Sequence, residues 1–418
     1  MPLLFPAVHR VRYLTDMDKF ELEILCLRLK SLTVFRELLN DSVIKALCKY
    51  LELAQTDDVL AVVTSYSEFV SRLYEANGSD LAAYINDAVN NSENVYVCAI
   101  GSGKEVNENI IRAVDEELKT LQLIADISSK ALCKEIGQFT FLPEFCSGGV
   151  NIKESFIHRV NNIGKYGYGI YAKNPMFYID CENKIVPVKN PDSISLESLV
   201  DYERERSIIL DNTKALVEGK AAANILLTGD AGTGKSSTVK AVGNAFFADG
   251  LRIIEVRKEQ LGSIPSILDE LAVNPLKFIL FIDYLAFRND DDNFNALKAV
   301  LEGSVSAKSK NVVIYATSNR RHIVRETFSD REGDDIHRND TMQEMVSLSE
   351  RFGIHVRFHK PDKATYLNIV HHMVKEKNIT VDEAQIDLLA ERFALERGNR
   401  SARLAKQFVE GLDIKEGI

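Results

Sequence analysis

The sequence predicts an α/β fold, in which a parallel sheet with helices on both faces follows a mostly helical N-terminal domain and precedes a helical lid. Three observations lead to this prediction. Strand-like and helix-like segments alternate in the second half of the chain, a glycine-rich loop joins one such strand to a helix, and the pattern after Pro361 is wholly helical.

The first part of the chain carries apolar residues at helical spacing. From about Asp18 to Ile124 the apolar stripes follow one another, which is typical of a helical bundle. The segment from Phe177 to Val188 has the pattern of a hairpin and is followed by prolines and a polar tract. We therefore place a boundary near residue 190 and expect an N-terminal domain over 1–190, a core over 191–360 and a lid over 361–418.

Five apolar segments of the second half read as buried strands separated by helices: Ile225–Thr228, Leu251–Val256, Phe278–Asp283, Val312–Thr317 and Ile354–His359. Such alternation indicates a parallel sheet. Ligands of open parallel sheets bind beyond the carboxyl ends of the strands. The glycine-rich loop, Asp283 and Asn319 all fall at such ends, so we expect one site there.

The glycine-rich loop fits the eight-residue phosphate-binding pattern, whose positions are Gly229, Asp230, Ala231, Gly232, Thr233, Gly234, Lys235 and Ser236. It lies between a strand and a helix that continues through Ser237. Main-chain N–H groups at such a turn, beside a helix N-terminus, favour a polyphosphate. We expect Lys235 to reach the β and γ phosphates and Ser236 to complete the shell of a Mg²⁺ ion.

Two further polar residues end neighbouring strands. Asp283 follows an apolar run about 48 residues after Lys235, a setting in which a carboxylate holds Mg²⁺ directly or through water. It could instead cap a helix. Asn319 could hydrogen-bond the γ-phosphate or orient an attacking water, or be a simple turn residue.

Composition argues against a membrane protein, a protein built to coat nucleic acid and a cysteine-based metal site. No apolar run approaches the ~18 residues of a membrane-spanning helix, so we expect no membrane insertion and a cytoplasmic location. The formal charge of −10 argues against a protein built to coat nucleic acid. The six cysteines show no metal-binding spacing, and we expect reduced, packed thiols.

Residues 195–415 resemble the AAA+ ATPases, and more closely a family of predicted P-loop ATPases known chiefly as a domain of unknown function. The matching stretches are Leu199–Arg204, the phosphate-binding loop, Phe278–Asp283, Ala316–His322, Leu348–Gly353 and Arg397–Arg403. They extend over about half of the chain.

The resemblance implies roles for three residues. Asn319 corresponds to sensor 1, Arg351 to an arginine finger and Arg403 to sensor 2 on the lid, although surface salt bridging is an alternative for each arginine. It also implies ATP as the nucleotide, since the chain has no Asn-Lys-x-Asp tetrad that would read guanine. A site shared between subunits implies a homo-oligomer, for which a ring is one arrangement.

One position departs from the resemblance. Tyr284 stands where AAA+ proteins carry Glu after the Mg²⁺ aspartate, and where the closer family carries a second Asp. A phenol with an ordinary pKa near 10 is a poor substitute for a carboxylate that polarises water. We expect slow hydrolysis, unless Asp290, Asp291, Asp292 or Glu302 supplies the charge.

The leading hypothesis is an ATPase that couples its nucleotide cycle to an unidentified protein partner, selected by the N-terminal domain. The competing hypothesis is a non-hydrolysing switch or scaffold, which Tyr284 favours. A nucleic-acid loader ranks last: the basic cluster Arg320-Arg321-His322 with Arg325 suggests it, but the overall acidity opposes it.

Overall fold

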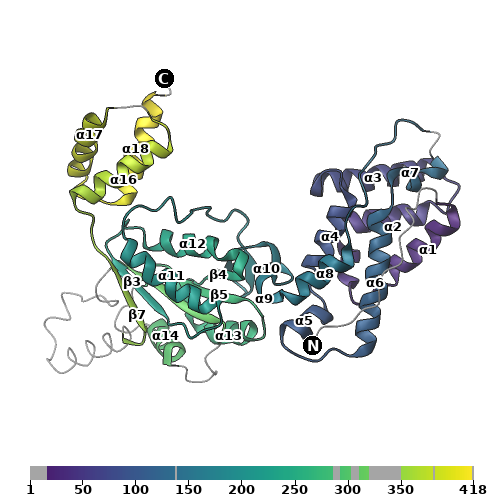
Figure 1. Cartoon of the computed structure of the whole chain (residues 1–418), viewed down its shortest axis with the longest axis horizontal. Coiled ribbons are helices and arrows are strands. Elements are labelled where there is room, and N and C mark those ends of the chain that lie inside the picture. The colour runs from purple at the N-terminus through teal and green to yellow at the C-terminus, as the bar shows by residue number, and fades with distance from the viewer. Residues whose placement is uncertain are drawn as a thin grey trace. The chain divides into compact units, whose positions relative to one another are not determined.

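The computed structural model of the chain describes residues 17–136, 139–285, 292–302, 310–319, 350–379 and 382–416. The chain forms two compact units (Figure 1). The first comprises Met1–Ile163 and Gly167–Ala172, and the second comprises Gly164–Tyr166 and Lys173–Ile418. The residues between 173 and 190, which the sequence pattern assigned to the N-terminal domain, thus belong to the second unit by their contacts.

The described part of the first unit is helical, as the apolar stripes predicted. Its longer helices are α1 (Lys19–Lys30), α2 (Ser42–Leu53), α3 (Val59–Asn77), α4 (Leu81–Asn91), α5 (Val95–Gly101), α6 (Glu108–Asp126) and α8 (Ile152–Asn161). Its shorter elements are η1 (Arg36–Asn40), α7 (Ser129–Leu132) and η2 (Lys134–Ile136), and α9 (Ile163–Tyr166) and α10 (Ile170–Lys173) each span a boundary between the units. Side chains of Asp18 and Asp41 cap the first turns of α1 and α2.

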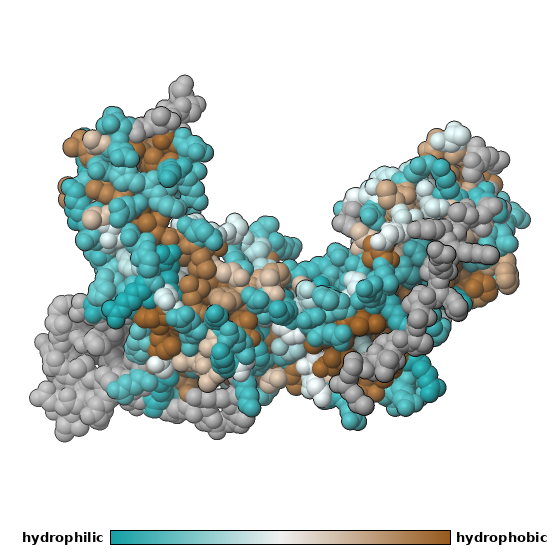
Figure 2. All heavy atoms as spheres, viewed as in Figure 1, coloured by the Kyte–Doolittle hydropathy of each residue, from teal (hydrophilic) through white to brown (hydrophobic). Residues whose placement is uncertain are grey.

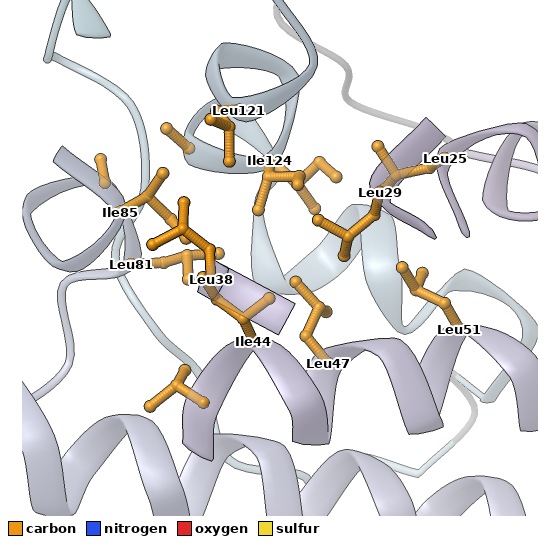
Figure 3. Packing of buried hydrophobic residues seen from close by; sticks show 14 of the residues in the cluster. Leu25, Leu29, Leu38, Ile44, Leu47, Leu51, Leu81, Ile85, Leu121 and Ile124 are labelled. Carbon is orange, nitrogen blue, oxygen red and sulfur yellow. The ribbon is translucent and has the colours of Figure 1, made fainter. Parts of the chain in front are cut away.

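The core of the first unit draws on most of these helices, and one part of it consists of aliphatic side chains from four of them and from η1. Figure 3 shows them converging: Leu25 and Leu29 of α1, Leu38 of η1, Ile44, Leu47 and Leu51 of α2, Leu81 and Ile85 of α4, and Leu121 and Ile124 of α6. Glu117 of α6 is buried beside this core, where its carboxylate accepts hydrogen bonds from the amides of Thr33, Val34 and Phe35. These bonds offset the cost of burying the charge.

The second unit is built on one sheet, with seven strands in the described residues: β1 (Met176–Ile179), β2 (Ile185–Pro187), β3 (Ile225–Gly229), β4 (Leu251–Glu255), β5 (Lys277–Ile282), β6 (Val312–Ser318) and β7 (Ile354–Phe358). Their order is β2-β1-β4-β5-β6-β3-β7. The five predicted strands are confirmed, and they pair in parallel. The predicted hairpin is the antiparallel pair of β1 and β2, and β1 extends the sheet in parallel beside β4.

Helices cover both faces of this sheet (Figure 1). Apolar residues of α11 (Glu203–Val217) and α12 (Lys235–Ala245) share one buried cluster with alternate residues of the strands. The helices α13 (Ile264–Ala272) and α14 (Asp292–Glu302) lie on the other side, and the short turns η3 (Phe247–Asp249) and η4 (Lys258–Ser263) flank β4. The predicted α/β architecture is therefore confirmed.

The predicted helical lid is also present. It consists of α16 (Lys363–Glu376), α17 (Glu383–Glu396) and α18 (Ala402–Glu416). These helices have a core of their own, which includes Tyr366, Ile386 and Phe408.

Hydrophilic residues make up most of the face of each unit that is visible in Figure 2. No helix among the described residues is long and apolar enough to cross a membrane. The cysteines differ from the expectation of packed thiols: Cys26 and Cys133 are buried, whereas Cys146 and Cys181 are exposed.

Candidate functional site

The glycine-rich loop connects the carboxyl end of β3 to the first residue of α12. Three of its residues have the positive φ angles that favour glycine: 146° at Gly229, 79° at Gly232 and 91° at Gly234. At Gly229 a Cβ atom would lie 2.1 Å from the carbonyl oxygen of Phe358 on neighbouring β7. The loop therefore depends on glycine, both for its backbone angles and for the close packing of the two strands.

Lys235, the first residue of α12, is buried, and main-chain and side-chain oxygens surround its amine. Nζ donates to the carbonyl oxygens of Gly229 and Asp230 at 2.8 Å each, and to Oδ1 of Asn319 at 3.0 Å. Burial lowers the pKa of Lys235 to about 8, while the carboxylates of Asp283 and Asp230 oppose the shift and the Arg403 guanidinium adds to it. The structure thus brings together the loop, Lys235 and Asn319.

Ser236 and Asp283 also meet. The hydroxyl of Ser236 donates to Oδ1 of Asp283 at 2.7 Å, and the hydroxyl of Thr317 donates to the same oxygen at 2.6 Å. In the described part of the chain, no three His, Cys, Asp or Glu side chains are placed to hold a metal by themselves. A hydroxyl beside one carboxylate does fit Mg²⁺, which binds through one or two carboxylates together with phosphate oxygens and water.

Tyr284 follows Asp283 at the same edge of the sheet. Its φ angle is 65°, an unusual value for a residue with a side chain, and 53% of its surface is exposed. Its amide donates to Oγ1 of Thr317 at 2.9 Å. The phenol is therefore held on a sharp turn beside the candidate metal residues.

These residues line a cavity of about 580 Å³ within the second unit. One wall is the loop with Asp283, Tyr284, Thr317 and Asn319. The other walls come from the segment that precedes α11, with Ile194, Ser198 and Leu199, and from the lid, with Met373, Lys377, Arg403, Lys406 and Val409. The volume lies within the range of small-molecule sites.

Arg403, in the first turn of α18, joins the lid to the loop. Its amide donates to the carbonyl oxygen of Gly232 at 3.4 Å, and a Cβ at Gly232 would lie 3.1 Å from the Cβ of Arg403. The positive charge of the guanidinium also lowers the pKa of Lys235, because the two cations repel each other. Two cations, Lys235 and Arg403, thus line the cavity beside the loop, together with the carboxylate of Asp283.

The structure does not bring Arg351 to this cavity. Arg351 precedes β7 and lines a second cavity of about 540 Å³, together with Lys220, Lys310 and Gly353. Because Ile225 at the start of β3 pairs in parallel with Ile354, this region lies at the amino ends of the strands. It is the edge opposite to the glycine-rich loop.

Several predicted positions lie outside the described residues: Asp290, Asp291, Arg320, Arg321, His322 and Arg325. The backbones of Asp292 and Glu302 belong to α14, but the positions of their side chains are not described. The source of any additional negative charge beside Tyr284 stays a prediction.

Sequence reasoning did not single out Thr317 or the wall made by Ile194, Ser198 and Leu199. One signal for Thr317 exists, since it is a polar residue near the carboxyl end of an apolar strand. Its partner, however, depends on the register, in which Ile282 pairs with Ala316 and Asp283 therefore comes beside Thr317. Of the wall residues before α11, Leu199 begins one of the matching stretches, whereas Ile194 and Ser198 belong to none.

Fold and loop together define the class: this is an α/β protein with a mostly parallel sheet, a glycine-rich loop of the phosphate-binding pattern between β3 and α12, and a helical lid. The chain belongs to the family described as "Protein of unknown function (DUF815)", whose profile matches residues 173–415. The matched segment falls within the second unit.

No curated protein matches the chain. Among solved structures, it is similar to the Thermotoga maritima RuvB Holliday junction branch migration motor, with 15% identity and a TM-score of 0.36. A single-residue variant of that protein gives 16% identity and a TM-score of 0.37. In both comparisons the match covers 52% of this chain and 63% of the other, so this chain matches less than two thirds of the length of these structures.

Proposed function

We propose that this protein binds ATP with Mg²⁺ in the cavity beside the glycine-rich loop and hydrolyses it slowly, coupling nucleotide state to a protein partner. The observation that carries the proposal is the arrangement around Lys235: a buried amine, the left-handed glycines Gly232 and Gly234 and a helix N-terminus line the same cavity as the Ser236 and Asp283 pair.

The charges at this end of the cavity support binding of a polyphosphate. Amides at the N-terminus of α12 lack partners within the helix and carry its positive dipole end. Lys235 and Arg403 add two cations. We infer that a bound phosphate chain would replace the carbonyl oxygens of Gly229 and Asp230 as the partner of the Lys235 amine.

Ser236 and Asp283 are the residues that would hold Mg²⁺. When bound, the ion neutralises phosphate charge and orients the phosphoryl oxygens. Asn319, already within hydrogen-bond distance of Lys235, is placed at the same end of the cavity and would contact the terminal phosphate or orient the attacking water.

Slow turnover follows from Tyr284. A carboxylate at this position would accept a proton from the attacking water, which a neutral phenol does poorly. The same residue favours a second candidate function, a switch that binds ATP without hydrolysing it. The two differ in a single measurable quantity, the rate of phosphate release.

Assembly and domain roles complete the proposal. Arg351 lies at the edge opposite to the loop, so we infer that it acts as an arginine finger on the site of a neighbouring copy, within a homo-oligomer that closes into a ring. The helical first unit (Met1–Ile163 with Gly167–Ala172) would recognise the partner, the sheet of the second unit would bind nucleotide and the lid (361–418) would respond to it through Arg403.

The test uses the full chain and isothermal titration calorimetry with ATP and Mg²⁺, followed by a phosphate-release assay. We expect binding in the micromolar range and its loss, by at least tenfold, in Lys235→Ala. Lys240→Ala is the matched control, because Lys240 is on the same helix but pairs with Asp192 instead of lining the cavity. The proposal fails if the wild type binds no ATP, or if both variants bind as it does.

A further inference from the structure

The hydroxyl of Thr317 connects two consecutive residues of the candidate metal site. It lies 2.6 Å from Oδ1 of Asp283 and 2.9 Å from the main-chain nitrogen of Tyr284. An amide can only donate, so the hydroxyl accepts from Tyr284 and its own proton goes to the carboxylate. The direction of both bonds is therefore fixed by chemistry.

Burial makes these two bonds consequential. Thr317 is 2% exposed, so water does not compete well for its hydroxyl. The main chain reinforces the contact, because the amide of Leu285 donates to the carbonyl oxygen of Thr317 at 2.6 Å. The turn from Asp283 to Leu285 is thus attached to strand β6 at three points.

This turn needs such support because Tyr284 has a left-handed backbone, which is unfavourable for a residue with a side chain. A strained turn next to a metal ligand would leave the direction of the carboxylate poorly determined. The two hydroxyls on Oδ1, from Ser236 and Thr317, fix that direction. Among the described residues, none donates a hydrogen bond to the other oxygen, Oδ2.

We propose that Thr317 is a positioning residue for the metal-binding carboxylate: its hydroxyl holds Oδ1 of Asp283 and the amide of Tyr284, so that Oδ2 is directed to Mg²⁺. The inference rests on the proposed function, since it concerns the same site. Thr317 acts through Asp283 and is not itself a ligand. Removal of its hydroxyl should weaken the response to Mg²⁺ and leave Mg²⁺-free nucleotide binding intact.

The experiment compares Thr317→Val, which keeps the shape and loses the hydroxyl, with Thr317→Ser, which keeps the hydroxyl. ATP affinity of the full chain is measured over a Mg²⁺ titration and again in EDTA. Loss of a residue that orients a metal ligand typically costs about 10–100-fold in metal affinity. The Mg²⁺ midpoint is the Mg²⁺ concentration that gives half of the increase in ATP affinity. We expect this midpoint to rise at least tenfold in Thr317→Val, while ATP affinity in EDTA stays within about twofold of the wild type. In Thr317→Ser the midpoint should return to the wild-type value.

A matched control removes a buried hydroxyl elsewhere in the same unit. Thr213 of α11 is fully buried, and its hydroxyl bonds to the carbonyl oxygen of Ile209 and to the hydroxyl of Tyr315 on β6. Neither of these two bonds involves Asp283. Thr213→Val should lower the melting temperature without moving the Mg²⁺ midpoint. If Thr317→Val does not fold, Thr317→Cys replaces it, and its weaker donor should still raise the midpoint.

The outcomes are separable. Wild-type protein that binds no ATP would end the proposed function itself. If the wild type binds ATP but Thr317→Val has an unchanged Mg²⁺ midpoint, only the proposed role of Thr317 is overturned. A midpoint raised equally in Thr317→Ser would also overturn it, because the hydroxyl would then not be the cause.

Discussion

The amine of Lys235 lies 3.0 Å from Oδ1 of Asn319, and this contact joins the glycine-rich loop to the residue that follows strand β6. Carbonyl oxygens of Gly229 and Asp230 complete the surroundings of the amine. The protein itself thus supplies three oxygen acceptors for the lysine. A ligand must offer it more negative charge than these neutral oxygens do, which a polyphosphate does.

The first prediction concerns pH. The pKa of Lys235 is about 8 in the free protein, and a bound polyphosphate would raise it because negative charge favours the protonated amine. Binding therefore takes up a proton at pH values above about 8, and ATP affinity should fall as pH rises through that value. Calorimetry in buffers of different ionisation enthalpy would detect the uptake. Lys235→Arg is the control: whatever its affinity, it should show no such dependence.

The second prediction concerns turnover. Tyr284→Asp should increase ATP hydrolysis at least tenfold, because the carboxylate can accept a proton from water. Tyr284→Asn is the matched control, since Asn also tolerates a left-handed backbone but is neutral. Phosphate release at saturating ATP compares the three proteins. Equal rates in all of them would show that position 284 does not limit hydrolysis.

A third prediction tests whether sites are shared. Arg351→Ala should bind ATP as the wild type does and lose at least tenfold in hydrolysis, since a finger stabilises charge only during phosphoryl transfer. Mixing Arg351→Ala with Lys235→Ala should restore part of the activity, because some interfaces then combine an intact loop with an intact arginine. Mixtures that stay inactive at every ratio would contradict a role for Arg351 in a neighbouring site.

The fourth prediction concerns stability. Gly229→Ala should lower the free energy of unfolding by more than about 2 kcal/mol, because the new Cβ would lie 2.1 Å from the Phe358 carbonyl oxygen and the backbone is left-handed as well. Gly234→Ala meets no atom within 4 Å and carries only the backbone strain, so about 1 kcal/mol is expected. Urea denaturation of both variants measures the difference.

The strands and the lid were predictable because their patterns are local. Apolar runs such as Phe278–Ile282 are long enough to read as buried strands, and the glycine-rich loop fixes where β3 ends and α12 begins. The hairpin was predictable in the same way. Its addition to the sheet beside β4 was not, because the pairing of Phe177 with Ile254 joins segments far apart in the chain.

The site was only partly predictable for the same reason. Lys235, Ser236 and Asp283 follow from motifs and strand ends. Thr317 depends on the register of β5 and β6, which the composition of the strands does not determine. The place of Arg351 at the amino ends of the strands follows from the direction of β7, and a linear motif contains no such information.

The bond from the Arg403 amide to the Gly232 carbonyl oxygen has a consequence for how this protein can change over evolution. It is made by main-chain atoms on both sides, so mutation of the arginine can abolish the positive charge without severing the mechanical link between lid and loop. Variants at position 403 would therefore lose the charge beside Lys235 and keep the main-chain contact between lid and loop.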